Sequence, residues 1–208
     1  LERLYRSSRL IADASNEEQV WAISGQILKD VPYPTVLLQV DRNQLRVISS
    51  ADATQGLNSI DQLPSKFEAE YGEVNNYLLR GPVITSPSES STPSAFSDLI
   101  KRLEITSAAF IPIKKQDNLS AVILIGARDR VLTNTTIQLY SNLADLMTST
   151  LEKIDAVQQT ERHLREVESL ASINELISSE SDLQSFFRAL LGKIQQIIGD
   201  YNMIVALY

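Results

Sequence analysis

The sequence predicts an α+β protein in which a central antiparallel sheet carries helices on both faces and a long C-terminal linker helix follows. Two pairs of apolar, β-branched segments are each joined by a short polar turn, which is the pattern of β-hairpins. The second pair is almost continuously apolar, as is typical of strands that are covered on both faces. No Gly or Pro occurs between Thr133 and Gly192, so a single helix can extend over much of that stretch.

The first elements follow from helical periodicity and from one capping signal. Residues 1–14 predict a helix, and Ser15 with Glu18 forms a capping box that opens the next one. The apolar face of this second helix consists of Val20, Ile23, Ile27, Leu28 and Val31. The prolines in residues 32–34 end it, because proline cannot continue a helix.

Four strands are expected in two hairpins. Residues 35–40 and 45–49 form the first pair, and residues 108–113 and 119–127 form the second around the turn at 114–118. The middle of the chain is less regular.

Short helices are predicted there at 64–71 and 94–103, with a strand at 83–85. The segment 85–94 contains only Ser, Thr, Pro and Glu. We expect it to bury nothing and to form a mobile loop.

Composition excludes several classes of function. The net charge of −7 gives no basic footprint for a nucleic acid. The chain has no cysteine, which removes disulfides, thiolate catalysis and thiolate-bound metals. Its one histidine, His163, lies in a charged helical stretch, so we expect no catalytic triad, no enzyme activity, no metal and no cofactor.

The cellular compartment of the protein can be predicted from the length of its apolar runs and from its first residues. The longest apolar run, at 121–125, is far shorter than the ~20 residues of a membrane span. No signal peptide is visible, and the absence of cysteine fits a reducing compartment. We therefore expect a cytoplasmic protein with no membrane partner, of which this chain, beginning at Leu1 without Met, is a piece.

The long helix predicted at 133–178 carries an apolar stripe that suits a partner helix. Its members are Leu143, Met147, Leu151, Ile154, Val157, Leu164 and Val167. The steps of three and four residues predict a seam for a homodimer, although the stripe from 139 to 151 also suits packing on the chain's own sheet. The polar break at 158–163 is either a weak point that transmits a change of register or an ordinary solvated stretch.

The end of the chain repeats its beginning. Residues 176–207 reproduce the cap, helical face, break and strand of residues 10–40, with Ser181 and Gln184 as the second capping box. Such repeats define domain organisation. We expect a domain at 1–155, a helical coiled-coil linker at 156–175, and the truncated start of a second domain at 176–208.

The segment 109–153 resembles the closing pattern of the GAF family of sensory domains. The matching motifs are Ile111-Pro112-Ile113, Leu132-Thr133 and Leu143-Ala144-Asp145. The likeness covers about residues 10–155 and starts again near 170. Ser120 and Thr136 depart from the family pattern, which usually has Gly and an acidic residue there.

This resemblance implies a regulatory input module of a signal-transduction protein. A small molecule bound by such a domain would lie between the sheet and residues 65–102. The walls so implied are Phe67, Tyr71, Tyr77, Phe96 and Leu99. The polar contacts so implied are Asn75, Asn76, Arg80, Ser97 and Asp98.

Two alternatives remain open from the sequence. The aromatic residues of the implied chamber could simply fill the core of the domain. In that case the chain would be a ligand-free dimerisation and spacer domain. The family's signature for cyclic nucleotides is not recognisable, and the cysteines of its bilin-binding and reductase members are absent.

Overall fold

Six strands form one antiparallel sheet in the computed structural model, which describes residues 9–52, 63–179 and 192. The strand order is β3-β2-β1-β6-β5-β4, and every neighbouring pair is antiparallel. The strands are β1 (Thr35–Asp41), β2 (Gln44–Ala51), β3 (Lys66–Glu68), β4 (Val83–Thr85), β5 (Ser107–Lys115) and β6 (Asn118–Ala127). The two predicted hairpins and the strand at 83–85 are confirmed.

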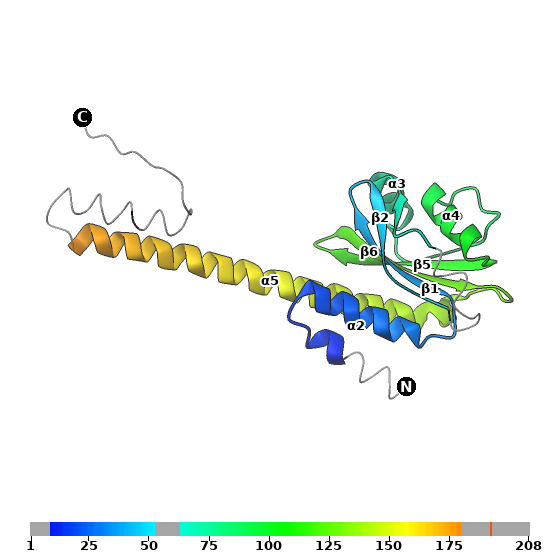
Figure 1. The fold of residues 1–208 in the computed structure, drawn as a ribbon, viewed down its shortest axis with the longest axis horizontal. Coiled ribbons are helices and arrows are strands. Elements are labelled where there is room, and N and C mark those ends of the chain that lie inside the picture. Colours follow the sequence, from blue (N-terminus) through cyan, green and yellow to red (C-terminus); the bar gives the residue numbers. More distant parts are fainter. Residues whose placement is uncertain (1–8, 53–62, 180–191, 193–208) are drawn as a thin grey trace. The chain divides into compact units, whose positions relative to one another are not determined.

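Helices cover both faces of this sheet, as expected (Figure 1). The helices are α2 (Glu17–Lys29), α3 (Tyr71–Tyr77), α4 (Ser94–Arg102) and α5 (Asn134–Ser179). On one face α2 and the first part of α5 bury Trp21, Leu28 and Met147 against the sheet. On the other face α3 and α4 bury Val74, Phe96 and Leu99.

The chain divides into two compact units, Leu1–Asp155 and Ala156–Tyr208. Helix α5 belongs to both, since it is continuous over 46 residues and therefore measures about 69 Å at 1.5 Å per residue. The prediction of one very long helix is confirmed to within a residue at each end. No helix in the described part of the chain combines the length and apolar character that a membrane span requires.

The two turn residues of the β5–β6 hairpin have the backbone conformation that twisted strands require. Gln116 and Asp117 have φ angles of 51° and 63°, the left-handed pair that a two-residue turn needs to match twisted strands. The Asn118 side chain donates a hydrogen bond to the Gln116 carbonyl at 3.1 Å, which stabilises this turn without glycine.

Two local predictions were wrong in detail. The N-cap of α2 is Asn16 instead of Ser15, because the Asn16 side chain accepts a hydrogen bond from the Gln19 backbone N–H at 2.9 Å. The helix predicted at 64–71 is instead the short strand β3 followed by α3. Phe67 pairs with Leu45 in the sheet register, and this long-range pairing overrides the local helical pattern.

The loop at 85–94 also differs from expectation, because it buries part of its length. Thr85, Thr92 and Pro93 are buried, and the Thr85 and Thr92 hydroxyls lie 2.9 Å apart. A threonine can be buried when its hydroxyl has a partner.

Several predictions fall on residues outside the described ranges. Residues 9–14 of the first predicted helix are described, and of these only residues 9–12 are helical. The repeated capping box at Ser181 and Gln184 and the repeated strand at 203–207 lie outside the described residues.

Gly126 on β6 provides a test of the packing. A Cβ at this position would lie 2.7 Å from two side-chain carbons of buried Ile105. We expect Gly126→Ala to lower the free energy of unfolding by about 1–3 kcal/mol, because the core must shift to admit the methyl group. Urea unfolding monitored by circular dichroism measures this.

The matched control is Gly72→Ala in α3, where a Cβ would meet nothing within 4 Å. We expect this variant to be as stable as the parent or up to about 1 kcal/mol more stable. Equal stability of the two variants would contradict the described packing of Ile105 on β6.

Candidate functional site

The region between the sheet and helices α3 and α4, called the chamber below, is filled by buried side chains that include an aromatic cluster. Phe96 from α4 stacks on Phe110 from β5, with ring centroids 3.9 Å apart and planes 13° apart. Tyr77 from α3 meets both rings edge-on, at 6.0 and 6.5 Å between centroids. Such edge-to-face and stacked contacts stabilise the cluster beyond simple burial. The core of this chamber is therefore aromatic.

Polar groups of the tyrosines lie where the aromatic cluster meets loops and strand ends. The Tyr71 hydroxyl accepts a hydrogen bond from the Leu119 backbone N–H at 3.2 Å. The Tyr77 hydroxyl lies 3.5 Å from the Thr92 hydroxyl, and the Thr85 hydroxyl donates to the Glu89 carboxylate at 2.8 Å. The loop at 85–94 is thereby linked to α3 by a chain of hydroxyl contacts.

The sequence-predicted walls lie in or beside this chamber. Phe67, Phe96 and Leu99 are buried there, and Tyr71 and Tyr77 pack against the same cluster while half-buried. The prediction did not include Phe110, although it stacks on Phe96. Its strand was predicted, but the face on which each residue lies depends on the register of pairing.

The predicted polar contacts are more scattered. The Ser97 hydroxyl donates to the Thr92 carbonyl at 3.4 Å, close to the loop, and Asn75 is half-buried. Asp98 forms a half-exposed ion pair with Arg102 at 2.7 Å along α4. Asn76 and Arg80 are exposed.

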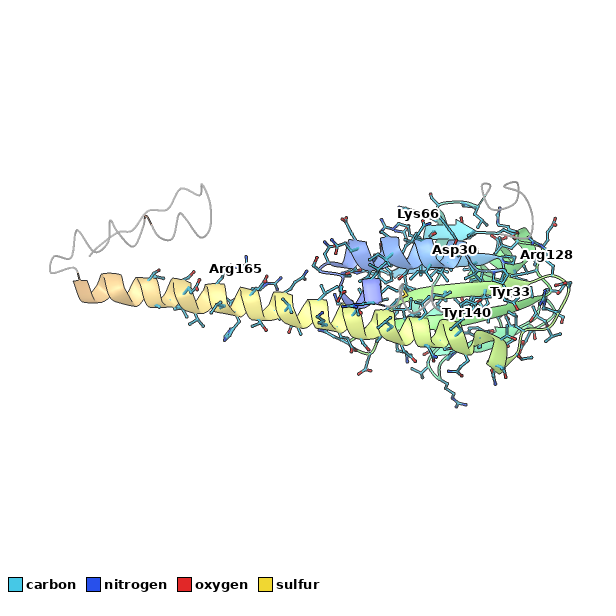
Figure 2. All side chains as sticks on the ribbon, turned by 90° about the horizontal axis from the view of Figure 1, so that it is seen from below. Asp30, Tyr33, Lys66, Arg128, Tyr140 and Arg165 are labelled. Atoms are coloured by element: carbon cyan, nitrogen blue, oxygen red, sulfur yellow. The ribbon has the colours of Figure 1, made fainter. Side chains whose placement is uncertain are left out.

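A hollow lies at the end of β6, before α5 begins. It has a volume of about 230 Å³ and is lined by Pro32, Tyr33, Pro34, Ala127, Arg128, Asp129 and Arg130. The Arg130 guanidinium lies 5.5 Å from the centre of the Tyr33 ring, a cation–π distance. Figure 2 shows Tyr33, Arg128 and Tyr140 in this part of the first unit.

Arg128 beside this hollow is held in place by a largely buried ion pair. Its guanidinium lies 2.7 Å from Asp52, and the two side chains are 18% and 4% exposed. It also donates to the Leu103 carbonyl at 3.0 Å. The pair joins residues 76 positions apart in the chain, so no local sequence signal could have identified it.

Another hollow, of about 380 Å³, lies at the β1–β2 turn and is lined mostly by polar residues. Gln39, Arg46 and Lys66 pair across three neighbouring strands there. Backbone and side-chain hydrogen bonds from Arg42 and Gln44 lower the pKa of the exposed Asp41 carboxyl. The hollow therefore combines two cations with an ionised carboxylate.

The predicted helix seam divides into two parts. Leu143, Met147, Leu151 and Ile154 are buried in the first unit's core, against the chain's own sheet. In the second unit Val157, Leu164 and Val167 are 50%, 56% and 48% exposed. Only the latter three are therefore accessible to a partner helix.

Candidate metal ligands and bases are sparse in the described residues. No three His, Cys, Asp or Glu side chains among them gather closely enough to hold a metal ion. His163 is exposed on α5, and its imidazole Nδ1 lies 3.7 Å from Glu166.

Comparison with solved structures shows a shared fold. The crystal structure of the bacteriophytochrome RpBphP3 from the photosynthetic bacterium R. palustris matches with a TM-score of 0.61 and 10% sequence identity, over 94% of this chain and 46% of that one. The Stigmatella aurantiaca phytochrome photosensory core module matches with a TM-score of 0.60 and 12% identity, over 95% of this chain and 46% of that one.

This chain therefore spans about half the length of either phytochrome structure. No protein-family model matches its sequence, and the search of curated proteins gives no significant match. At this level of identity the likeness establishes the fold.

Tyr140 in α5 provides a pH-dependent test of the first unit's core. Burial raises the pKa of Tyr140 to about 12, with a smaller contribution from Tyr33. The unfolded phenol ionises near the ordinary pKa of 10, so between pH 10 and about 12 the native state keeps a proton that the unfolded state releases. This contribution to stability is complete below pH 10 and is lost as the pH rises through 12.

We expect Tyr140→Phe to make the fall in unfolding free energy between pH 10 and about 12 shallower, as measured by urea titrations across that range. Tyr33→Phe is the matched control, and most of the parent's slope is expected to remain, since Tyr33 is only half-buried. An unchanged slope in Tyr140→Phe would show that this phenol ionises equally readily in both states.

Proposed function

We propose that this chain is part of a GAF-like regulatory input module of a cytoplasmic signal-transduction protein. Its first unit binds a small molecule in the chamber of α3 and α4, and α5 passes the change to a second copy of the chain. The fold that it shares with two phytochromes, one of them a photosensory core module, supports this proposal. The motifs at 109–153 support it independently.

The observation that carries the proposal is the position of β5 between the chamber and α5. Alternate residues of a strand point to opposite faces of a sheet. Phe110 accordingly contributes to the chamber, while its neighbours Ala109 and Ile111 belong to the core that contains α5. A ligand that displaces the Phe96–Phe110 pair would therefore strain the same strand on which α5 packs.

Polar contacts then join the β5–β6 hairpin to α5. The Lys114 backbone N–H donates to the Thr148 hydroxyl at 3.3 Å, and the Lys115 ammonium lies 3.1 Å from Asp155. The Gln116 side chain donates a hydrogen bond to the same Asp155 carboxylate. A movement of the hairpin would thus act on α5 at the last residue of the first unit.

A ligand-free spacer domain is the second candidate function. The specific observation in its favour is the Phe96–Phe110 stack at 3.9 Å, which fills the chamber with the protein's own side chains. In this case α5 would still join two copies, but no small molecule would control them.

Ligand recovery distinguishes the two candidates. For the sensory module, native mass spectrometry of gently purified protein is expected to show a mass excess over the 23.2 kDa chain. Hydrogen exchange of residues 86–91 is expected to slow in the loaded form, because Thr85 and Thr92 join this loop to Tyr77. A bare chain mass with unchanged exchange for every compound tested would favour the spacer.

The dimer is tested separately on the exposed part of α5. Val157→Glu and Leu164→Glu would each place two carboxylates in an apolar seam, and we expect each to weaken dimerisation about 100-fold or more, equivalent to about 3 kcal/mol. Sedimentation velocity over a concentration series measures the effect.

Gln158→Glu is the matched control, since it adds the same charge at an exposed neighbouring position on another face of the helix. We expect it to dimerise like the parent. A Val157→Glu or Leu164→Glu variant that stays fully dimeric would refute the seam.

A further inference from the structure

We infer that Arg128 couples the end of α4 to the start of α5. This inference rests on the proposed function and names how its chamber acts on α5, since α4 forms one wall of the chamber. The contacts involved join residues 103–107 to residues 126–132, and we call them the clasp. They lie at the end of the β5–β6 hairpin away from its turn, where Ser107 pairs with Ala127.

The end of α4 is capped in part by Arg128. The helix closes with a Schellman motif, in which Glu104 has a left-handed φ of 52° and the Ile105 backbone N–H donates to the Ile100 carbonyl at 3.2 Å. The carbonyl of the C-cap residue Leu103 accepts a hydrogen bond from the Arg128 guanidinium at 3.0 Å. A cation at this place also interacts favourably with the negative end of the helix dipole.

The Arg128 guanidinium is held in place between two acceptors. One nitrogen, Nη2, donates both to the Asp52 carboxylate at 2.7 Å and to the Leu103 carbonyl at 3.0 Å. Hydrogen bonds that involve a charged group are stronger than those between neutral groups, and limited exposure to water strengthens them further. A shift of Leu103 at the end of α4 therefore acts directly on Arg128.

The backbone of Arg128 belongs to the connection between β6 and α5. The Thr106 hydroxyl donates to the Arg128 carbonyl at 2.8 Å. Four residues later the Leu132 backbone N–H donates to the buried Ser107 hydroxyl at 3.0 Å. The segment that follows α4 therefore holds this connection at two points.

Helix α5 begins directly after the second of these points. The Thr133 hydroxyl accepts a hydrogen bond from the Thr136 backbone N–H at 3.3 Å, and its carbonyl accepts one from the Ile137 N–H at 3.1 Å. Leu132 and Ile137, on either side of this cap, are both buried in the core beneath α5, as in a hydrophobic staple that fixes the entry angle of a helix. A change in the position of Leu132 would therefore change the direction in which α5 starts.

Close packing makes the clasp rigid. A Cβ on Gly126 would lie 2.7 Å from two side-chain carbons of Ile105, so the two backbones are as near as a glycine allows. The Thr106 backbone N–H also donates to the Ala127 carbonyl at 2.8 Å. Such packed segments move together instead of deforming gradually. We therefore expect a displacement of the end of α4 to reach the first turn of α5.

A double variant removes the clasp's ion pair without leaving a single buried charge. Asp52→Leu with Arg128→Met replaces both partners by apolar side chains, a change that folded proteins often tolerate. Arg128→Lys serves if this variant does not fold, because lysine keeps a cation beside Asp52 but lacks the guanidinium fork that also binds Leu103.

Two further variants are the matched controls. Asp52→Asn removes the ion pair and keeps the guanidinium that binds Leu103. Arg130→Met removes an arginine of the same connection that is 60% exposed and lies against Asp129 and the Tyr33 ring.

A mild change in α4 takes the place of a ligand in this test. Ile100→Val shortens by one carbon a side chain that is 1% exposed in the chamber, a change that a folded domain usually tolerates. The measurement is hydrogen exchange of the backbone amides of residues 137–141, by mass spectrometry of the full chain. Amides of the buried strand β6 exchange by unfolding of the whole unit and report its stability in each variant.

We expect Ile100→Val to speed the exchange of residues 137–141 about threefold or more in the parent chain, as for residues coupled through one hydrogen-bond network. The same substitution is expected to leave this exchange unchanged in the Asp52→Leu, Arg128→Met double variant or in Arg128→Lys. Asp52→Asn and Arg130→Met are expected to keep the parent's response.

An equal response with and without Arg128 would overturn the inference, and so would the lack of a response in the parent chain. Loss of the response in Arg130→Met would attribute it to a general weakening of the connection and also overturn the inference. These results leave the chamber's ligand and the dimer untouched, since native mass spectrometry and sedimentation test those separately. Conversely, a chain that yields no ligand but responds only when Arg128 is present would refute the sensory module and leave the clasp in place.

Discussion

Burial of the β5–β6 hairpin on both faces is the constraint on which the rest of the first unit depends. Phe110 and Leu124 belong to the core beneath α3 and α4, while Ile111 and Ile123 belong to the core beneath α2 and α5. Each such side chain contributes about 1.5–3 kcal/mol when it is fully buried. The two strands thus form the common wall of two cores, and neither core can repack without affecting the other.

This shared wall gives a physical basis for coupling across the sheet. The aromatic chamber and α5 lie on opposite faces, and no direct contact between them is needed, since a strand that shifts moves the side chains of both faces together. The hairpin turn adds polar contacts from Lys115 and Gln116 to Asp155. These polar contacts fix the turn against the end of the first unit's part of α5, in addition to the apolar packing.

Helix α5 has two chemical environments along one continuous helix. Up to Ile154 most of its apolar residues are buried in the core of the first unit, with Leu139 as an exposed exception, whereas Val157, Leu164 and Val167 are about half exposed. The spacing of three and four residues holds up to Val157 and resumes at Leu164, after the polar break at 158–163. A stripe of one helical period therefore packs on the chain's own core in one part and stays exposed in another, where the proposed dimer would use it, and only burial distinguishes the two parts.

The sequence alone determined the hairpins and the long helix, because each depends on patterns within a few neighbouring residues: alternation and turn residues for β5–β6, and the absence of Gly and Pro for α5. The features that depend on contacts between residues far apart in the sequence were decided only by the tertiary structure. Residues 66–68 form a strand because Phe67 pairs with Leu45. Thr92 can be buried because its hydroxyl lies within hydrogen-bond distance of the Thr85 hydroxyl. Arg128 forms its ion pair with Asp52, which is 76 residues away in the sequence. Phe110 stacks on Phe96 for the same reason, since strand register sets the face on which a side chain lies.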